Sequence, residues 1–237
     1  MNLLLIEPEE LEDGSRRVRV GGRRRRHAEQ ILRAGPGASL RVGVVGGRIG
    51  TARVMALDAE TLDLEVRLER DPPPKLAFQL VLALPRPPVF RRLLSTVSSL
   101  GIERLLVVGT ARTEKSFWQS RVVEPGAIRE RLLLGLEQAG DTILPEVELH
   151  RYFEPLVKDV LPACLVGRRG LLAHPGAGRP CPHGVADPVT CFVGPEGGLL
   201  DHEIEKLVGA GFLPVDLGER VLRVEPVIPM LVGRLAS

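Results

Sequence analysis

The sequence predicts an α/β protein in two parts, a small β-barrel followed by a larger, mostly parallel sheet covered by helices. Three observations lead to this fold class. Residues 1–70 hold several short strand-like runs and a single helical stretch, Asp71 to Pro74 is a proline run, and strand-like and helical stretches alternate from residue 75 onward. A proline run lacks N–H donors and favours extended backbone, so it separates two predicted domains, residues 1–70 and 75–237.

In the first part, short strand-like runs are separated by turn residues. Gly46-Gly47 is a hairpin signal between two of these runs. One helical stretch is expected over His27–Arg33 and is ended by Gly35-Pro36-Gly37. The predicted strands are Arg17–Val20, Leu40–Val45, Arg48–Leu57 and Thr61–Leu68.

In the second part, strand and helix signals alternate as in sheets whose two faces are covered. Asp201 is the expected N-cap of the helix that it begins, and Gly209 or Gly211 marks the end of that helix. The predicted strands are Leu76–Leu84, Arg104–Val108, Gly170–Ala173, Val189–Val193 and Leu213–Leu217. The predicted helices are Phe90–Leu100, Ile128–Ala139 and Asp201–Val208.

Composition excludes several classes of protein. Hydrophobic residues make up 44% of the 237, enough for a buried core, but aromatics make up 3%, too few for a module that stacks many RNA bases. Three cysteines without a C-x-x-C motif fit a reducing compartment and argue against a disulfide framework or a zinc site. The apolar run at Leu3–Ile6 is too short for a signal segment, and no run is long enough to span a membrane. We therefore expect a cytoplasmic protein without a metal.

Basic residues are concentrated near the start of the chain, although the net charge is only +2. Arg23, Arg24, Arg25 and Arg26 are consecutive and His27 follows. A local cluster of this kind predicts contacts to nucleic-acid phosphates. A solvated surface run has the same pattern, so both interpretations remain open.

Three segments follow predicted strands in the second part, and they are the candidates for chemistry. Gly194-Pro195-Glu196-Gly197-Gly198 is glycine-rich but is neither a P-loop nor a G-x-G-x-x-G motif. Leu171–Gly176 is another strand end followed by a loop, and Val215–Pro229 begins at a strand end and holds Arg220, Arg223 and Glu225. Ligands of open α/β sheets bind beyond the carboxyl ends of strands, so one pocket could unite all three segments. An ordinary tight turn and a surface network of ion pairs are the alternatives.

The combination of these motifs resembles the RsmE family of ribosomal RNA methyltransferases, which belongs to the SPOUT class. The resemblance rests on G-P-E-G-G followed by L-G-x-R-x-L-R-x-E at Leu217–Glu225. Arg26-His27 with Ile31-Leu32-Arg33 and Gly37 is similar to the N-terminal motif of the family. Leu136–Ala139 with Leu144-Pro145 is similar to its mid-chain motif, so the likeness covers essentially the whole chain.

The resemblance implies a fold, an activity and partners. It implies a PUA-like β-barrel up to about residue 70, a trefoil-knotted methyltransferase domain from about residue 75, and a homodimer. The reaction implied is transfer of a methyl group from S-adenosyl-L-methionine to N3 of a uridine in small-subunit ribosomal RNA, within the 30S subunit or as free RNA.

The resemblance also implies site residues. The cofactor-binding residues would be Leu172, Ala173, His174, Pro175, Gly194, Pro195, Glu196, Gly197, Gly198, Leu217, Gly218, Val221, Leu222 and Arg223. The RNA-binding residues would be Arg23, Arg24, Arg25, Arg26, His27 and Arg33. Loss of the uracil N3 proton needs a cation that stabilises the anion, for which Arg223 is the candidate, or a general base, for which Glu225 is the candidate. A structural ion pair is the alternative for both.

Four positions depart from the family pattern. Pro226 and Val227 replace a usual Thr-Ala pair, Gly140 stands where an Arg is common, and Pro88 stands where a Lys is common. The last two remove positive charge, so a catalytically weak or inactive RNA-binding protein is the second hypothesis. A third, an unrelated nucleotide-dependent enzyme, lacks a phosphate-binding loop in this sequence.

Overall fold

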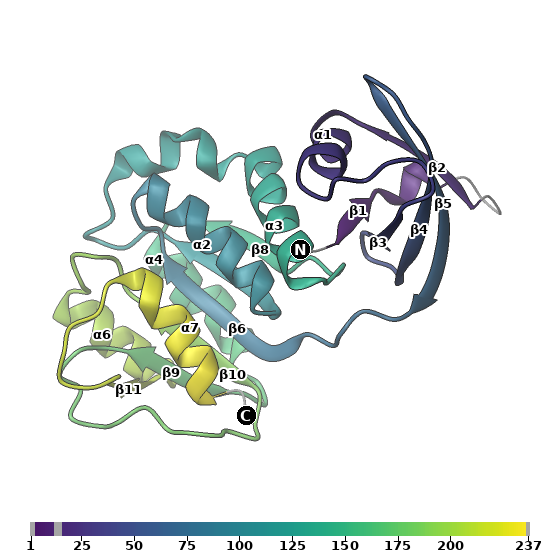
Figure 1. Cartoon of the computed structure of the whole chain (residues 1–237). Coiled ribbons are helices and arrows are strands. Elements are labelled where there is room, and N and C mark those ends of the chain that lie inside the picture. Colours follow the sequence, from purple (N-terminus) through teal and green to yellow (C-terminus); the bar gives the residue numbers. More distant parts are fainter. Residues whose placement is uncertain (1–2, 12–15, 236–237) are drawn as a thin grey trace. The chain divides into compact units, whose positions relative to one another are not determined.

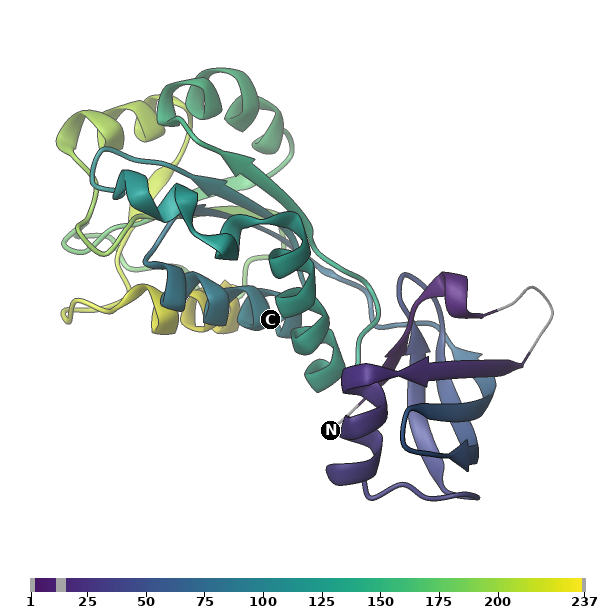
Figure 2. The same ribbon diagram turned by 90° about the horizontal axis from the view of Figure 1, so that it is seen from above.

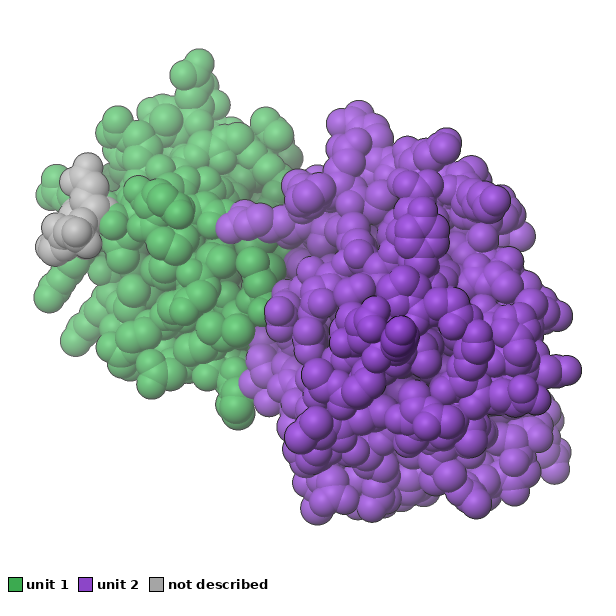
Figure 3. All heavy atoms as spheres, turned by 180° about the vertical axis from the view of Figure 1, so that it is seen from behind, with its two compact units in different colours: residues 1–74, 133–144 green, residues 75–132, 145–237 purple. Residues whose placement is uncertain are grey.

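The computed structural model describes residues 3–11 and 16–235, which form two compact units (Figure 3). Unit 1 holds the described residues up to Pro74 and also Leu133–Leu144. Unit 2 holds Lys75–Leu132 and the described residues from Pro145 onward. Helix α3 (Pro125–Ala139) therefore contributes to both units.

Unit 1 contains a five-stranded sheet in the order β1-β3-β4-β5-β2, in which β1 pairs parallel with β3 and the other pairs are antiparallel. Strands β1 and β2 form its two edges, so the described strands make an open sheet. Alternate side chains, among them Val18, Val42, Val54 and Leu64, are buried in one core. The strands are β1 (Leu4–Ile6), β2 (Arg17–Gly21), β3 (Ser39–Val44), β4 (Ile49–Leu57) and β5 (Thr61–Arg70).

Helix α1 spans Gly22–Gln30, so the prediction of a helix over His27–Arg33 was wrong at both ends. Its only buried side chain is Ala28, so no apolar periodicity marks its start, while arginine is a good helix former. The helix ends before Gly35 because Arg33 adopts a left-handed backbone with φ of 50° and the Ala34 N–H bonds to the Ala28 carbonyl at 3.0 Å.

Unit 2 contains a six-stranded sheet in the order β11-β9-β10-β6-β7-β8, with every pair parallel (Figure 1). Strand β8 was not predicted, because Glu-Val-Glu-Leu-His at a sheet edge carries only two aliphatic residues. The strands are β6 (Leu76–Ala83), β7 (Ile102–Val108), β8 (Glu146–His150), β9 (Arg169–Ala173), β10 (Val189–Val193) and β11 (Leu213–Val215).

Helices cover both faces of this sheet. Figure 2 shows α2 (Pro87–Ser99) and α7 (Val224–Leu235) on one face and α4 (Phe153–Pro155) with α6 (Asp201–Gly209) on the other. In α2, apolar side chains at positions 90, 93, 94 and 97 are buried, which is the spacing of one helix face. Pro87 and Pro88 occupy its first turn, where no backbone N–H is needed.

Two further differences from the sequence predictions concern helices. Asp201 is the first residue of α6 rather than its N-cap; Leu200 takes the cap position, and its N–H donates to Glu203 Oε2 at 2.8 Å. The helical segment after β8, comprising α4, a π-helical turn at Leu156–Val160 and α5 (Leu161–Cys164), was missed because Pro155 and Pro162 interrupt its pattern. Short 3-10 helices lie at Pro8–Glu10, Lys115–Gln119 and Arg121–Val123. Over the described ranges, no helix combines the length and the hydropathy needed to cross a membrane.

Candidate functional site

The carboxyl ends of β11, β9 and β10 lie side by side in unit 2. Val215, Ala173 and Val193 end these strands and are paired in register, Val215 with Ala173 and Ala173 with Val193. The three segments that follow therefore start along one line at the same edge of the sheet. They enclose a cavity of about 430 Å³.

The cavity is lined by residues from all three segments. Of the residues predicted to bind the cofactor, Leu172 is the one that does not line it. Leu172 is fully buried on the opposite face of β9, in a cluster with Leu106 and Phe192. The lining residues are Ala173, His174, Pro175, Val193, Gly194, Pro195, Glu196, Gly197, Gly198, Leu199, Val215, Leu217, Gly218, Arg220, Val221, Leu222, Arg223, Val224 and Val227.

The lining combines aliphatic walls with backbone and a few charges. Gly194–Gly198, which we call the glycine loop, closes tightly because the Gly198 N–H donates to the Pro195 carbonyl at 2.8 Å. Gly198 has a φ of 76° and Gly218 a φ of 125°, conformations that disfavour a side chain. A mainly apolar cavity of this volume with few polar side chains is typical of a small-molecule site.

The two catalytic candidates are separated. Arg223 is exposed and lines the cavity, whereas Glu225 does not line it and forms an ion pair with Arg92 of α2, with an Nε–Oε1 distance of 3.0 Å. Glu225 lies in the first turn of α7, where a carboxylate is favourable. Pro226 is also in this turn, so its missing N–H costs the helix no hydrogen bond.

Most of the basic run is paired within unit 1. Arg23 donates two hydrogen bonds to Glu137, at 2.9 and 2.6 Å, and Arg24 is paired with Glu10. Arg25 is paired with Glu29 at 2.6 Å. Within residues 3–11 and 16–235, no hydrogen bond or ion pair involves the side chains of Arg26, His27 or Arg33. The charge available to a phosphate is therefore smaller than the run of arginines indicates.

The model of the RNA methyltransferase domain family matches residues 72–235. The chain belongs to this family. Among curated proteins it is similar to "Ribosomal RNA small subunit methyltransferase E" of Treponema pallidum, 29% identical with 95% of this chain and 86% of the relative covered. It is also similar to "Ribosomal RNA small subunit methyltransferase E 1" of Borreliella burgdorferi, 20% identical with 95% and 93% covered.

The fold is also that of solved structures. A ribosomal RNA small subunit methyltransferase E from Neisseria gonorrhoeae, bound to S-adenosylmethionine, has a TM-score of 0.77 and 23% identity, with 97% of this chain and 95% of that chain covered. A protein from Legionella pneumophila, in complex with the same cofactor, has a TM-score of 0.73 and 20% identity, with the same coverage.

Two other loops of this RNA methyltransferase contact the glycine loop, and neither was predicted from the sequence. Arg112 follows β7, and its Nη1 donates to the Gly197 carbonyl at 2.6 Å. Arg86 follows β6, and its backbone N–H donates to Glu196 Oε1 at 3.2 Å. Both loops leave the same edge of the sheet, so the strand-end rule that selected the other three segments could have found them.

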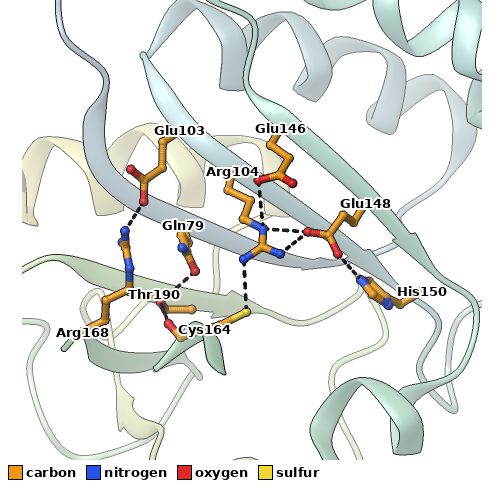
Figure 4. A network of polar contacts seen from close by, with 9 residues as sticks. All are labelled: Gln79, Glu103, Arg104, Glu146, Glu148, His150, Cys164, Arg168 and Thr190. Carbon is orange, nitrogen blue, oxygen red and sulfur yellow. Dashed lines mark hydrogen bonds and ion pairs between the residues drawn. The ribbon is translucent and has the colours of Figure 1, made fainter. Parts of the chain in front are cut away.

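A second polar cluster of the methyltransferase lies on β7 and on the neighbouring edge strand β8 (Figure 4). Arg104 of β7 is paired with Glu148 and Glu146 of β8, and His150 Nε2 lies 3.1 Å from Glu148 Oε2. Burial alone would lower the pKa of Arg104, but the hydrogen bond and charge of Glu148 raise it above its usual value. Because these charges satisfy one another, the cluster stabilises the sheet and is not a candidate site.

The cysteines of the methyltransferase are buried. Burial raises the pKa of the Cys164 and Cys181 thiols, and that of Cys191 well above its usual value. They are therefore protonated and unreactive at neutral pH. In the part of the chain that the structure describes, no group of three or more His, Cys, Asp or Glu side chains could hold a metal ion.

Proposed function

We propose that this chain transfers a methyl group from S-adenosyl-L-methionine to N3 of a uridine in 16S ribosomal RNA. The observation that carries the proposal is the cavity that three strand-end segments form in a chain of the RNA methyltransferase domain family. The name of the Treponema pallidum relative, which aligns with 95% of this chain, supports the RNA substrate.

The cavity suits the cofactor by its chemistry. Adenine has flat apolar faces and polar edges, and aliphatic side chains such as Leu217 and Leu222 can cover the faces. The backbone of the glycine loop and of Gly218 can meet the edges, because no side chain stands in the way there. S-adenosylmethionine, when bound, supplies a methyl group on a sulfonium, so the protein has only to orient the acceptor.

Arg223 supplies the electrostatic part of the reaction. The uracil N3 carries a proton at neutral pH, and a guanidinium at the cavity favours the anion that remains when this proton leaves. Arg223 lines the cavity. Glu225 is committed to Arg92, so we assign it to holding α7 against α2 rather than to proton transfer.

The RNA is held in part by unit 1, through the side chains of the basic run that have no partner within the described residues. Arg26 and Arg33 are exposed there. Gly140 stands where the family commonly has an Arg, and Arg41 supplies positive charge close to this position. Its Nη2 lies 3.3 Å from where a Cβ on Gly140 would be.

The finer architecture follows the same proposal. Residues 1–70, which carry the five strands of unit 1, belong to a PUA-like barrel for RNA, and residues 75–237 form a trefoil-knotted SPOUT domain. Two chains form a homodimer, which would cover the exposed apolar side chains of Val221 and Met230. A ribosomal RNA substrate and free thiols fit a cytoplasmic protein.

The proposal is tested by methyl transfer from labelled S-adenosylmethionine to small ribosomal subunits that lack N3-methyluridine, with mass mapping of the product. A single N3-methyluridine is the expected result, and it would show that Pro88, Gly140 and Pro226 are compatible with turnover. Cofactor binding without transfer to any RNA would favour the second candidate, an RNA-binding protein of ribosome assembly, to which the loss of charge at positions 88 and 140 points.

A further inference from the structure

The segment that follows β7 is held firmly against the glycine loop. Thr110–Thr113 forms a closed turn, in which the Thr113 N–H donates to the Thr110 carbonyl and the Thr110 N–H donates to Thr113 Oγ1, both at 3.1 Å. Thr110 is buried. The turn therefore presents the next residues, Ala111 and Arg112, in a fixed position.

Glu203 of α6 joins this turn to the end of the glycine loop. Glu203 is 1% exposed, and each oxygen of its carboxylate accepts one backbone N–H at 2.8 Å, Oε1 from Ala111 and Oε2 from Leu200. Burial of a carboxylate is costly unless hydrogen bonds and local dipoles compensate for it, and the first turn of α6 adds a favourable dipole. A single buried group thus fixes the distance between two loops.

Arg112 makes the second link. Its Nη1 donates to the Gly197 carbonyl at 2.6 Å. The side chain lies along the loop, since a Cβ on Gly197 would be 3.4 Å from Arg112 Cβ and Cδ, and one on Gly198 would be 3.5 Å from Nη1. Over the described residues, no carboxylate pairs with this guanidinium, so the Gly197 carbonyl is the contact that holds it.

We infer that Arg112 is a positioning residue, which together with Glu203 holds the glycine loop in the conformation that takes the cofactor. We call these two contacts, Arg112 to Gly197 and Glu203 to Leu200, the clamp. The identity of the ligand rests on the proposed function, but the clamp itself does not. The two links hold the carboxyl end of the loop, one at Gly197 within it and one at Leu200, two residues after Gly198. Loss of either link would free the loop to leave that conformation, and binding would then have to restore it.

The experiment measures hydrogen exchange of the backbone amides of residues 196–200 in the free protein, and the Kd for S-adenosylmethionine by calorimetry. Arg112→Ala should accelerate exchange there and raise the Kd about five- to tenfold, because one charge-assisted hydrogen bond is lost at an exposed site. Arg112→Lys should restore most of the slow exchange and most of the affinity for S-adenosylmethionine, since an ammonium can still donate to the Gly197 carbonyl. Arg121→Ala is the matched control: its side chain is 93% exposed and paired with Glu124, in the same chain segment.

Glu203→Gln is the second variant. It removes one of the two acceptor oxygens but keeps the side-chain volume, whereas Glu203→Ala would leave a cavity at this buried position. It should accelerate exchange at residues 199–200 and at Ala111. Unchanged exchange in both Arg112→Ala and Glu203→Gln would overturn the clamp. A raised Michaelis constant for RNA, with exchange and cofactor Kd unchanged, would instead make Arg112 an RNA contact. If the wild-type chain bound no S-adenosylmethionine, the proposed function would fail, while the exchange data would still decide the clamp.

Discussion

The substitution Gly198→Ala tests whether the glycine loop contacts the cofactor. Gly198 has a φ of 76°, in the left-handed region, where a residue with a Cβ costs about 1–2 kcal/mol. The added methyl itself has room, because the nearest atom, Arg112 Nη1, would be 3.5 Å away. The cost is therefore conformational rather than steric.

This cost must appear in one of two measurements. If the loop relaxes in the free protein, binding has to restore the strained conformation, and the Kd rises by up to about 5- to 30-fold. If the surrounding structure holds the loop, the cost appears instead as a lower free energy of unfolding. Part of this loss is offset, because alanine has less conformational entropy than glycine in the unfolded chain.

Calorimetric titration with S-adenosylmethionine and thermal unfolding together measure both parts. Gly197→Ala is the control, because its backbone is not in the left-handed region and its new Cβ would make ordinary contacts with Arg112. Wild-type values of both the Kd and the unfolding midpoint for Gly198→Ala would refute the reasoning. Equal effects of the two substitutions would show that the loop tolerates no side chain at all, for a reason other than φ.

Four further outcomes are expected. Arg223→Ala should lower kcat about a hundredfold and the cofactor affinity much less; equal losses would make Arg223 a binding residue. Arg26→Ala should reduce the salt dependence of RNA binding by about one phosphate contact. Arg24→Ala should reduce it less, because Arg24 is already paired with Glu10. Equal slopes of binding affinity against salt concentration in the two variants would contradict this prediction. The hydrogen bond and charge of Arg19 hold the pKa of Asp63 below its usual value of 3.8, so the contribution of this carboxylate to stability is present above that pH and is lost as the pH falls through the lowered pKa. Acid unfolding of Asp63→Asn should accordingly depend less on pH. Gly50→Ala should destabilise unit 1 by about 1–3 kcal/mol or more in denaturant unfolding, because its Cβ would lie 1.9 Å from a backbone oxygen of β5; a midpoint like that of wild type would mean that the strands separate there.

Local patterns were reliable where one periodicity dominated. The strand prediction Val189–Val193 is confirmed to the residue, and Thr61–Leu68 lies within β5. They were unreliable where charge or proline hid the signal. The arginines of α1 gave no apolar face, and the prolines after β8 concealed a helical segment whose Leu156 and Leu161 are fully buried.

The candidate site was accessible from the sequence because its residues follow strands of one parallel sheet. Strand ends converge by geometry, so G-P-E-G-G and L-G-x-R-x-L-R-x-E could be assigned to one region without knowledge of their contacts. The same sequence could not separate Arg223 from Glu225, because two charges in one short segment give no sign of which one meets a partner from α2.

By itself, then, the sequence determined the α/β class, the strands that carry the site and the family resemblance, because these depend on short-range periodicity and motif spacing. Only the tertiary structure decided which charges are free. Glu137 neutralises Arg23 across 114 positions, and Glu203 meets Ala111 across 92. Such pairs depend on the order of strands and the direction of side chains, which are set by long-range burial and leave no trace in the spacing of residues along the chain.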